Sequence, residues 1–94
     1  MFIITLRLVD RAKAPQFIDG HNAWIKQGFD DGVFLLVGSL QPNAGGVILA
    51  HGASAEAIAA RVQDDPFVSG GVVRAEILAV APGRTDERLA FLTA

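Results

Sequence analysis

Cysteine and tyrosine are both absent from this chain of 94 residues. The lack of cysteine excludes disulfide bonds, thiolate metal sites and cysteine nucleophiles. A concentration of positive charge is also missing, because Lys and Arg are scattered from Arg7 to Arg88 and the formal net charge is −2. No surface for nucleic acid is therefore predicted, and we expect a small neutral or anionic molecule as the ligand.

Long hydrophobic runs do not occur either. No apolar stretch approaches the about 20 residues that a membrane-spanning helix needs. The first residues, Met1 to Arg7, lack the basic region and the small-residue cleavage site of a signal peptide. We therefore expect no association with a membrane and a cytoplasmic location.

Apolar residues nevertheless make up 51% of the sequence, spread over several short segments. A chain of this length buries one modest core, so we expect a single domain over residues 1–94. The apolar fraction is high for so short a chain, and part of that surface is predicted to be covered by a second subunit. A homodimer is the expected assembly.

The spacing of apolar residues predicts an α+β protein with the order β-α-β-β-α-β. Phe2–Val9 has the β-branched content of a strand, and helical spacing then runs from about Ala14 to the stop at Asp31-Gly32. The other expected elements are strands over 33–39, 47–50 and 72–80, a helix from an N-cap at Ser54 to about Gln63, and a tail or short helix over 84–94. This order is typical of a ferredoxin-like antiparallel sheet with both helices on one face.

His21 is the most unusual candidate for chemistry. Helical spacing aligns it with Phe17 and Trp24, so that it faces the sheet rather than water. Asp65 follows the second predicted helix, and the ends of the two helices are expected to meet in this fold. A carboxylate that accepts a hydrogen bond from an imidazole fixes the tautomer and raises basicity, as a general base requires.

Ordinary structural roles remain open for these residues. Residue type and spacing alone favour a core histidine bonded to a backbone carbonyl for His21, and common turn chemistry before Pro66 for Asp65. Ser39 either directs its hydroxyl into a cleft or simply ends a strand. His51 is expected at the surface, and no spaced ligand set supports a metal site that would join it to His21.

Four segments in the right order resemble the YCII-related family. They are the opening strand 2–6, His21 followed by Trp24 and Ile25, the segment 32–40, and the turn Asp64-Asp65-Pro66-Phe67 with the small residues after it. The last segment is the most specific. Relatives often carry Arg a few residues before the histidine and Pro at the position of Ser39, whereas this chain has Ile18-Asp19-Gly20 and serine.

The resemblance implies a dimeric α+β barrel in which His21 and Asp65 form the active-site pair. Substrate-binding positions on this reading are Trp24, Ser39, Pro66 and Phe67, with no cofactor and no metal. Members of the family with an assigned reaction are diverse and include a dehydrochlorinase acting on a chlorinated hydroxyquinol.

Two functions follow from these observations. The first is a small cofactor-independent enzyme in which His21, oriented by Asp65, moves a proton on a small cyclic or aromatic substrate by elimination, isomerisation or hydrolysis. The second is a non-catalytic module for ligand binding or assembly, in which the same pair is a structural hydrogen bond. A hydrogen-bonded pair that lines an open cleft favours the enzyme, and a pair sealed in the core favours the module.

Overall fold

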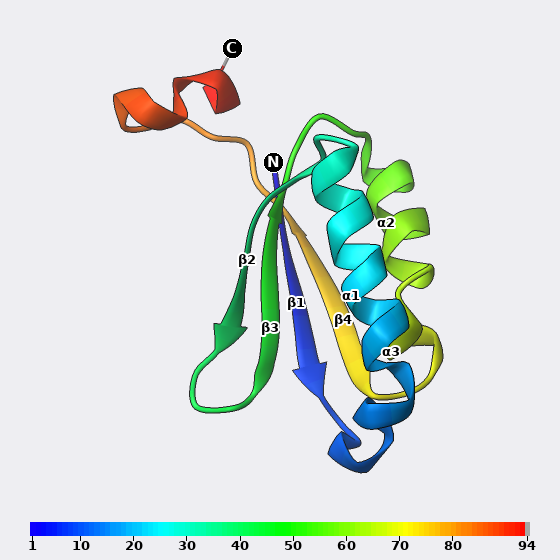
Figure 1. The fold of residues 1–94 in the computed structure, drawn as a ribbon. Helices are drawn as coiled ribbons and strands as arrows, with labels where there is room; N and C mark the ends of the chain where they lie inside the picture. Colours follow the sequence, from blue (N-terminus) through cyan, green and yellow to red (C-terminus); the bar gives the residue numbers. More distant parts are fainter. Residues whose placement is uncertain (94) are drawn as a thin grey trace.

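The computed structural model describes residues 1–93 and places three helices on one face of a β-sheet (Figure 1). The predicted α+β class and the order β-α-β-β-α-β are confirmed, with short helical turns added between the main elements. In chain order the elements are β1 (Phe2–Leu8), η1 (Arg11–Lys13), α1 (Ala14–Asp30), β2 (Phe34–Leu40), β3 (Gly45–Ala50), α2 (Ala55–Gln63), α3 (Pro66–Ser69), β4 (Val73–Ala79) and η2 (Glu87–Thr93).

The sheet has the strand order β2-β3-β1-β4, and every neighbouring pair is antiparallel. β2 and β3, which follow each other in the chain, therefore form a hairpin. The register separates two faces, since Ile4 pairs with Ile48 and both side chains are fully buried beneath the helices. The adjacent row joins Ile3 to Leu49 and Leu78 and points to the opposite face, because successive residues of a strand alternate between the two faces.

A close contact between α1 and the sheet explains why this helix contains a glycine near its end. A Cβ atom on Gly28 would lie 2.1 Å from Cδ2 of Phe34. Phe34 in turn meets Trp24 edge-on, with 5.1 Å between the ring centroids, and both side chains are buried. Glycine at this position lowers the stability of the helix, and the packing of the aromatic rings against the sheet compensates for that loss.

The turn after α2 differs from its expected form. Ser54 caps α2 as predicted, with its hydroxyl accepting from the backbone N–H of Ala57 at 3.1 Å. Asp65 was expected only to end that helix, but it also begins the short helix α3 as its N-cap. Pro66 favours this restart, since proline is well suited to the first position of a helix.

An ion pair joins the end of α1 to α2. The carboxylate of Asp31 accepts from Nε2 of Gln27 at 2.7 Å and from Nη2 of Arg61 at 2.9 Å. These two donors, the Gln27 amide first, hold the pKa of Asp31 below its usual value. The pair is one of the contacts that link the two helices covering the sheet.

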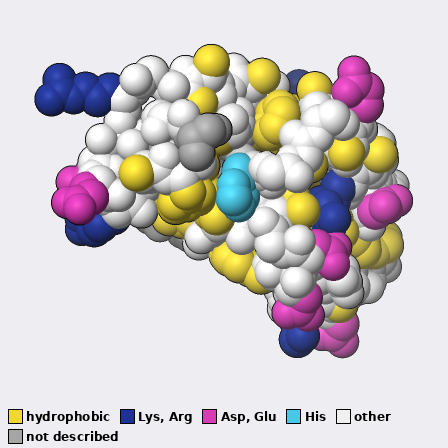
Figure 2. All heavy atoms as spheres, turned by 90° about the horizontal axis from the view of Figure 1, so that it is seen from above, with side chains coloured by type: hydrophobic (Ala, Val, Ile, Leu, Met, Phe, Trp, Pro, Cys, Tyr) yellow, Lys and Arg dark blue, Asp and Glu magenta, His cyan; other side chains and the backbone are white. Residues whose placement is uncertain are grey.

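Residues beyond β4 leave the body of the molecule as an extended segment that ends in η2 (Figure 1). Leu89 and Phe91 in this segment are exposed, and the Phe91 ring meets that of His51 with 5.4 Å between centroids. Figure 2, which views this end of the molecule, shows apolar side chains at the surface among scattered charged groups. Of the two forms expected for residues 84–94, a tail or a short helix, the structure shows a short helix over Glu87–Thr93. Ala94 lies outside the described residues.

Candidate active site

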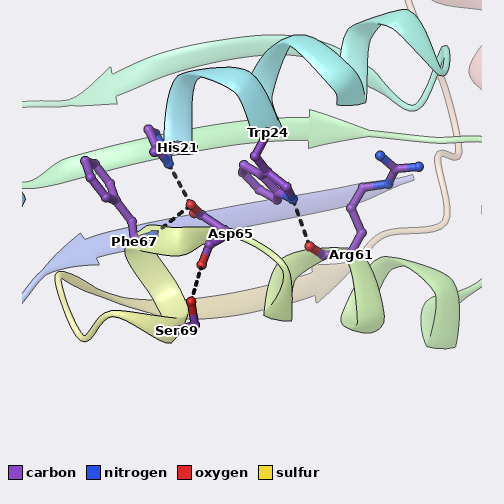
Figure 3. A network of polar contacts seen from close by, with 6 residues as sticks. All are labelled: His21, Trp24, Arg61, Asp65, Phe67 and Ser69. Carbon is purple, nitrogen blue, oxygen red and sulfur yellow. Dashed lines mark hydrogen bonds and ion pairs between the residues drawn. The ribbon is translucent and has the colours of Figure 1, made fainter. Parts of the chain in front are cut away.

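His21 and Asp65 are in direct contact. Nδ1 of His21 lies 2.8 Å from Oδ1 of Asp65, and Figure 3 shows the imidazole reaching from α1 to the start of α3. The Asp65 side chain is fully buried, whereas that of His21 remains 14% exposed. The pair is therefore closed to solvent on the carboxylate side and open on the imidazole side.

The position of Asp65 follows from its local sequence. Its Oδ1 also accepts from the backbone N–H of Phe67 at 2.9 Å, as an N-cap does. The backbone carbonyl of Asp65 accepts from the N–H groups of Val68 at 2.9 Å and Ser69 at 3.0 Å. One residue thus starts α3 and holds a carboxylate rigidly beneath His21.

The hydrogen bond decides which nitrogen of the imidazole carries a proton. An ionised carboxylate only accepts hydrogen bonds, so Nδ1 of His21 donates, and in the neutral ring Nε2 keeps its lone pair. Within residues 1–93, Oδ2 of Asp65 is buried without a hydrogen-bond partner. The hydrogen bond from Nδ1 of His21 and the one from the backbone N–H of Phe67 are thus the contacts that compensate the burial of this carboxylate.

Aromatic rings restrict how His21 can turn. The Phe67 ring stacks on the imidazole with 3.9 Å between centroids and 7° between planes. Trp24 lies on the same helix, 6.0 Å away by ring centroids. Its Nε1 donates to the backbone carbonyl of Arg61 at 2.9 Å, which ties α1 to α2 (Figure 3). The imidazole is thus fixed by a hydrogen bond on one edge and by a ring on one face.

A cavity of about 450 Å³ opens beside His21. It lies between α1, η1 and the β2–β3 hairpin, and most of its wall is apolar. Glycine accounts for part of the space, because Gly46 shares the helix-facing row of the sheet with Leu6 and has no side chain. The apolar residues of the wall are Leu6, Leu8, Ile18, Ile25, Val37, Val47, Ile48, Phe67 and Val73.

The residues expected to bind substrate divide into two groups. Ser39 and Phe67 line the cavity together with His21. Trp24 and Pro66 are not among its wall residues: the Trp24 indole is buried against Phe34, and Pro66 lies against the position of Gly20 at the contact of α1 with α3. Their surroundings therefore point to packing.

Three polar residues of the cavity were not singled out in the sequence. They are Arg11, Asn22 and Asn43, and Nη2 of Arg11 donates to the backbone carbonyl of Asn43 at 2.7 Å. Asn22 follows His21 on α1, while Arg11 and Asn43 lie in separate connections. The sequence carried no signal for Arg11 beyond its charge, because Arg11 lies outside the predicted strand and helix that flank it.

Other sites are not indicated by the described part of the chain. Residues 1–93 contain no cluster of three or more His, Asp or Glu side chains able to hold a metal ion. No helix within the same range combines the length and hydropathy needed to cross a bilayer.

Fold and cavity together define a ferredoxin-like α+β protein with a hydrogen-bonded His–Asp pair beside an apolar cavity. The YCII-related domain matches residues 3–80, so the chain belongs to the YCII-related family. The predicted family is thereby confirmed.

Among solved structures, the chain is similar to 5-chloro-2-hydroxyhydroquinone dehydrochlorinase from Burkholderia phenoliruptrix AC1100, in complex with 2,5-dihydroxybenzoquinone. The two share 16% identity with a TM-score of 0.65, and the match covers 88% of this chain and 96% of the other. A likeness at this identity shows a common fold. No curated protein sequence matches the chain.

Proposed function

We propose that this protein is a cofactor-independent enzyme in which His21 transfers a proton on a small cyclic or aromatic substrate. The observation that carries the proposal is the 2.8 Å contact between His21 and the buried Asp65 at the wall of an apolar cavity. The dehydrochlorinase with the same fold acts on an aromatic ring and supports the choice of substrate.

In the proposed mechanism Nε2 of His21 removes a proton from the bound ring. Asp65 keeps its charge throughout, orients the imidazole through Nδ1, and stabilises the imidazolium that forms. The buried position of Asp65 strengthens this interaction because little water screens it. In an elimination the leaving group departs with its electron pair, and in an isomerisation His21 returns the proton to another atom of the substrate.

His21→Asn tests this role directly. Turnover of 5-chloro-2-hydroxyhydroquinone, other chlorinated phenols and small lactones is measured, and we expect the variant to lose about 10²- to 10⁴-fold in kcat. His51→Asn is the matched control, since His51 is the other histidine of the chain and does not line the cavity. Equal rates for wild type and His21→Asn on a substrate that the wild type converts would contradict the proposal.

Asp65→Asn separates the charge of this residue from its structural role. Asparagine caps helices as well as aspartate does, so α3 is expected to persist while the negative charge beside His21 is lost. We expect a lower kcat with a nearly unchanged circular dichroism spectrum. In the wild type, ¹⁵N spectra of the imidazole should show the proton of the neutral ring on Nδ1.

The non-catalytic module remains the second candidate because Asp65 has a structural task of its own. Its Oδ1 accepts from the backbone N–H of Phe67, so part of its burial is explained without chemistry. Under this reading, Asp65→Asn and His21→Asn leave ligand binding intact and no substrate of the panel is converted by the wild type.

We also infer that the protein forms a homodimer through the face of the sheet opposite the helices. One row of this face runs Leu36, Leu49, Ile3 and Leu78 across all four strands. Leu36 is 48% and Leu78 44% exposed. Covering such a row with the same row of a second copy removes apolar surface from water on both sides.

A further inference from the structure

Arg11 is the cavity residue with the clearest unassigned chemistry. Apart from His21, it is the one ionisable side chain among the described residues that line the cavity, and no carboxylate belongs to the wall. Asp65, the carboxylate that contacts His21, is fully buried and is not part of the wall. The guanidinium of Arg11 therefore makes the electrostatic potential inside the cavity positive.

The guanidinium of Arg11 is held in place without being neutralised. Its Nη2 donates to the backbone carbonyl of Asn43 at 2.7 Å, a neutral acceptor on the β2–β3 turn. No ion pair joins Arg11 to a carboxylate within residues 1–93. A guanidinium has five N–H donors in a planar fork, so one anchored nitrogen leaves the others for an oxyanion.

The remainder of the wall suits a flat apolar body. Ile18 and Ile25 contribute from α1 and Val37 from β2, and the Phe67 ring stacks on His21 at the same wall. An apolar pocket with a few polar groups at defined places is the usual form of a site that orients a small ligand. A wall with one cationic side chain and otherwise apolar residues favours a ligand with one ring and a single anionic group.

We propose that the cavity binds anionic ring compounds, carboxylates or phenolates, and that Arg11 recognises the anionic group. This inference rests on the proposed function in that it names the substrate class of the same site. It assigns to Arg11 substrate positioning, while proton transfer stays with His21. An anion held by Arg11 places the ring of the ligand against His21 and Phe67.

The test compares benzoate with benzamide, which have the same ring and nearly the same shape and differ in charge. Affinities are measured by NMR chemical-shift titration of the full chain. We expect wild type to bind benzoate about tenfold more tightly, as a charge-assisted hydrogen bond provides. This preference should shrink as salt is added, because Arg11 is exposed.

Three variants locate the source of the preference. Arg11→Gln should abolish it, and Arg11→Lys should keep part of it, because lysine retains the charge but not the planar fork. Arg88→Gln is the matched control, since Arg88 is an exposed arginine of the C-terminal segment and does not line the cavity.

Several outcomes overturn the inference. The first is that wild type binds benzoate and benzamide with equal affinity. The second is that the preference for benzoate survives in Arg11→Gln. The third is that wild type shows no saturable benzoate binding at millimolar concentration. If Arg11→Gln lowers the affinity for benzoate and for benzamide equally, Arg11 only supports the β2–β3 turn. The proposed function fails separately: if His21→Asn keeps full turnover while the preference for benzoate persists, the anion site stands without the proton transfer.

Discussion

At the scale of single residues, the cavity depends on a position where the sheet has no side chain. Gly46 faces the helices, in the same row as Leu6 and Ser39. Gly46 does not have a positive φ angle, so its backbone conformation is one that residues with a side chain can also adopt. The nearest atom to a Cβ at Gly46 would be the carbonyl oxygen of Gly38, at 3.4 Å.

Gly46→Val is therefore expected to fill the cavity without unfolding the protein. Valine suits a strand, and its methyl groups would occupy the space where the ring of a ligand is expected. We predict that affinity for 2,5-dihydroxybenzoquinone or benzoate falls at least about tenfold. Thr5→Val is the control, because Thr5 pairs with Val47 in the row that points to the opposite face and does not line the cavity. Full affinity in Gly46→Val would place the ligand elsewhere.

At the scale of elements, the packing of α1 on the sheet is the contact most sensitive to added volume. The Phe34 ring fills the space beside Gly28, and Trp24 meets the same ring. Since Trp24 lies one turn beyond His21, a shift of α1 at this contact also moves the imidazole.

Gly28→Ala should destabilise the protein by about 1–3 kcal/mol, even though alanine favours a helix by about 1 kcal/mol. The cause is the forced displacement of Phe34. Urea unfolding followed by circular dichroism measures the change. Gly83→Ala serves as control because a Cβ there meets no atom within 4 Å. A variant at Gly28 as stable as wild type would show that α1 moves freely on the sheet.

At the scale of the whole molecule, the two faces of the sheet have different roles. The helices cover one face (Figure 1) and form the cavity with it. The other face carries the apolar row of Ile3, Leu36, Leu49 and Leu78, in which Leu36 and Leu78 are exposed. The high apolar content of the sequence is thus divided between a core and an uncovered surface.

Leu78→Lys is predicted to weaken the proposed homodimer by about a hundredfold or more in its dissociation constant, since an apolar side chain is lost from both copies. Size-exclusion chromatography with light scattering gives the mass in solution. Ala59→Lys is the control, because Ala59 is exposed on α2, on the helical side. A monomeric wild type, or a Leu78→Lys variant with unchanged mass, would refute this assembly.

Local patterns in the sequence determined the class of the fold and the order of its main elements. Alternation and helical spacing are properties of neighbouring residues, so they also predicted that His21 faces the sheet and that Asp65 ends a helix. The restart of the chain as α3 was missed, because a four-residue helix leaves no periodic signal.

Tertiary structure alone decided which residues share the cavity. His21 and Asp65 are 44 positions apart, and Arg11 and Asn43 are 32 apart, so no local pattern links the members of either pair. The pairing of β1 with β3 and β4 brings these distant segments together through long-range packing of apolar surface. For that reason the sequence indicated the candidate His–Asp pair by its residue types, whereas the role proposed for Arg11 became visible only once the chain was folded.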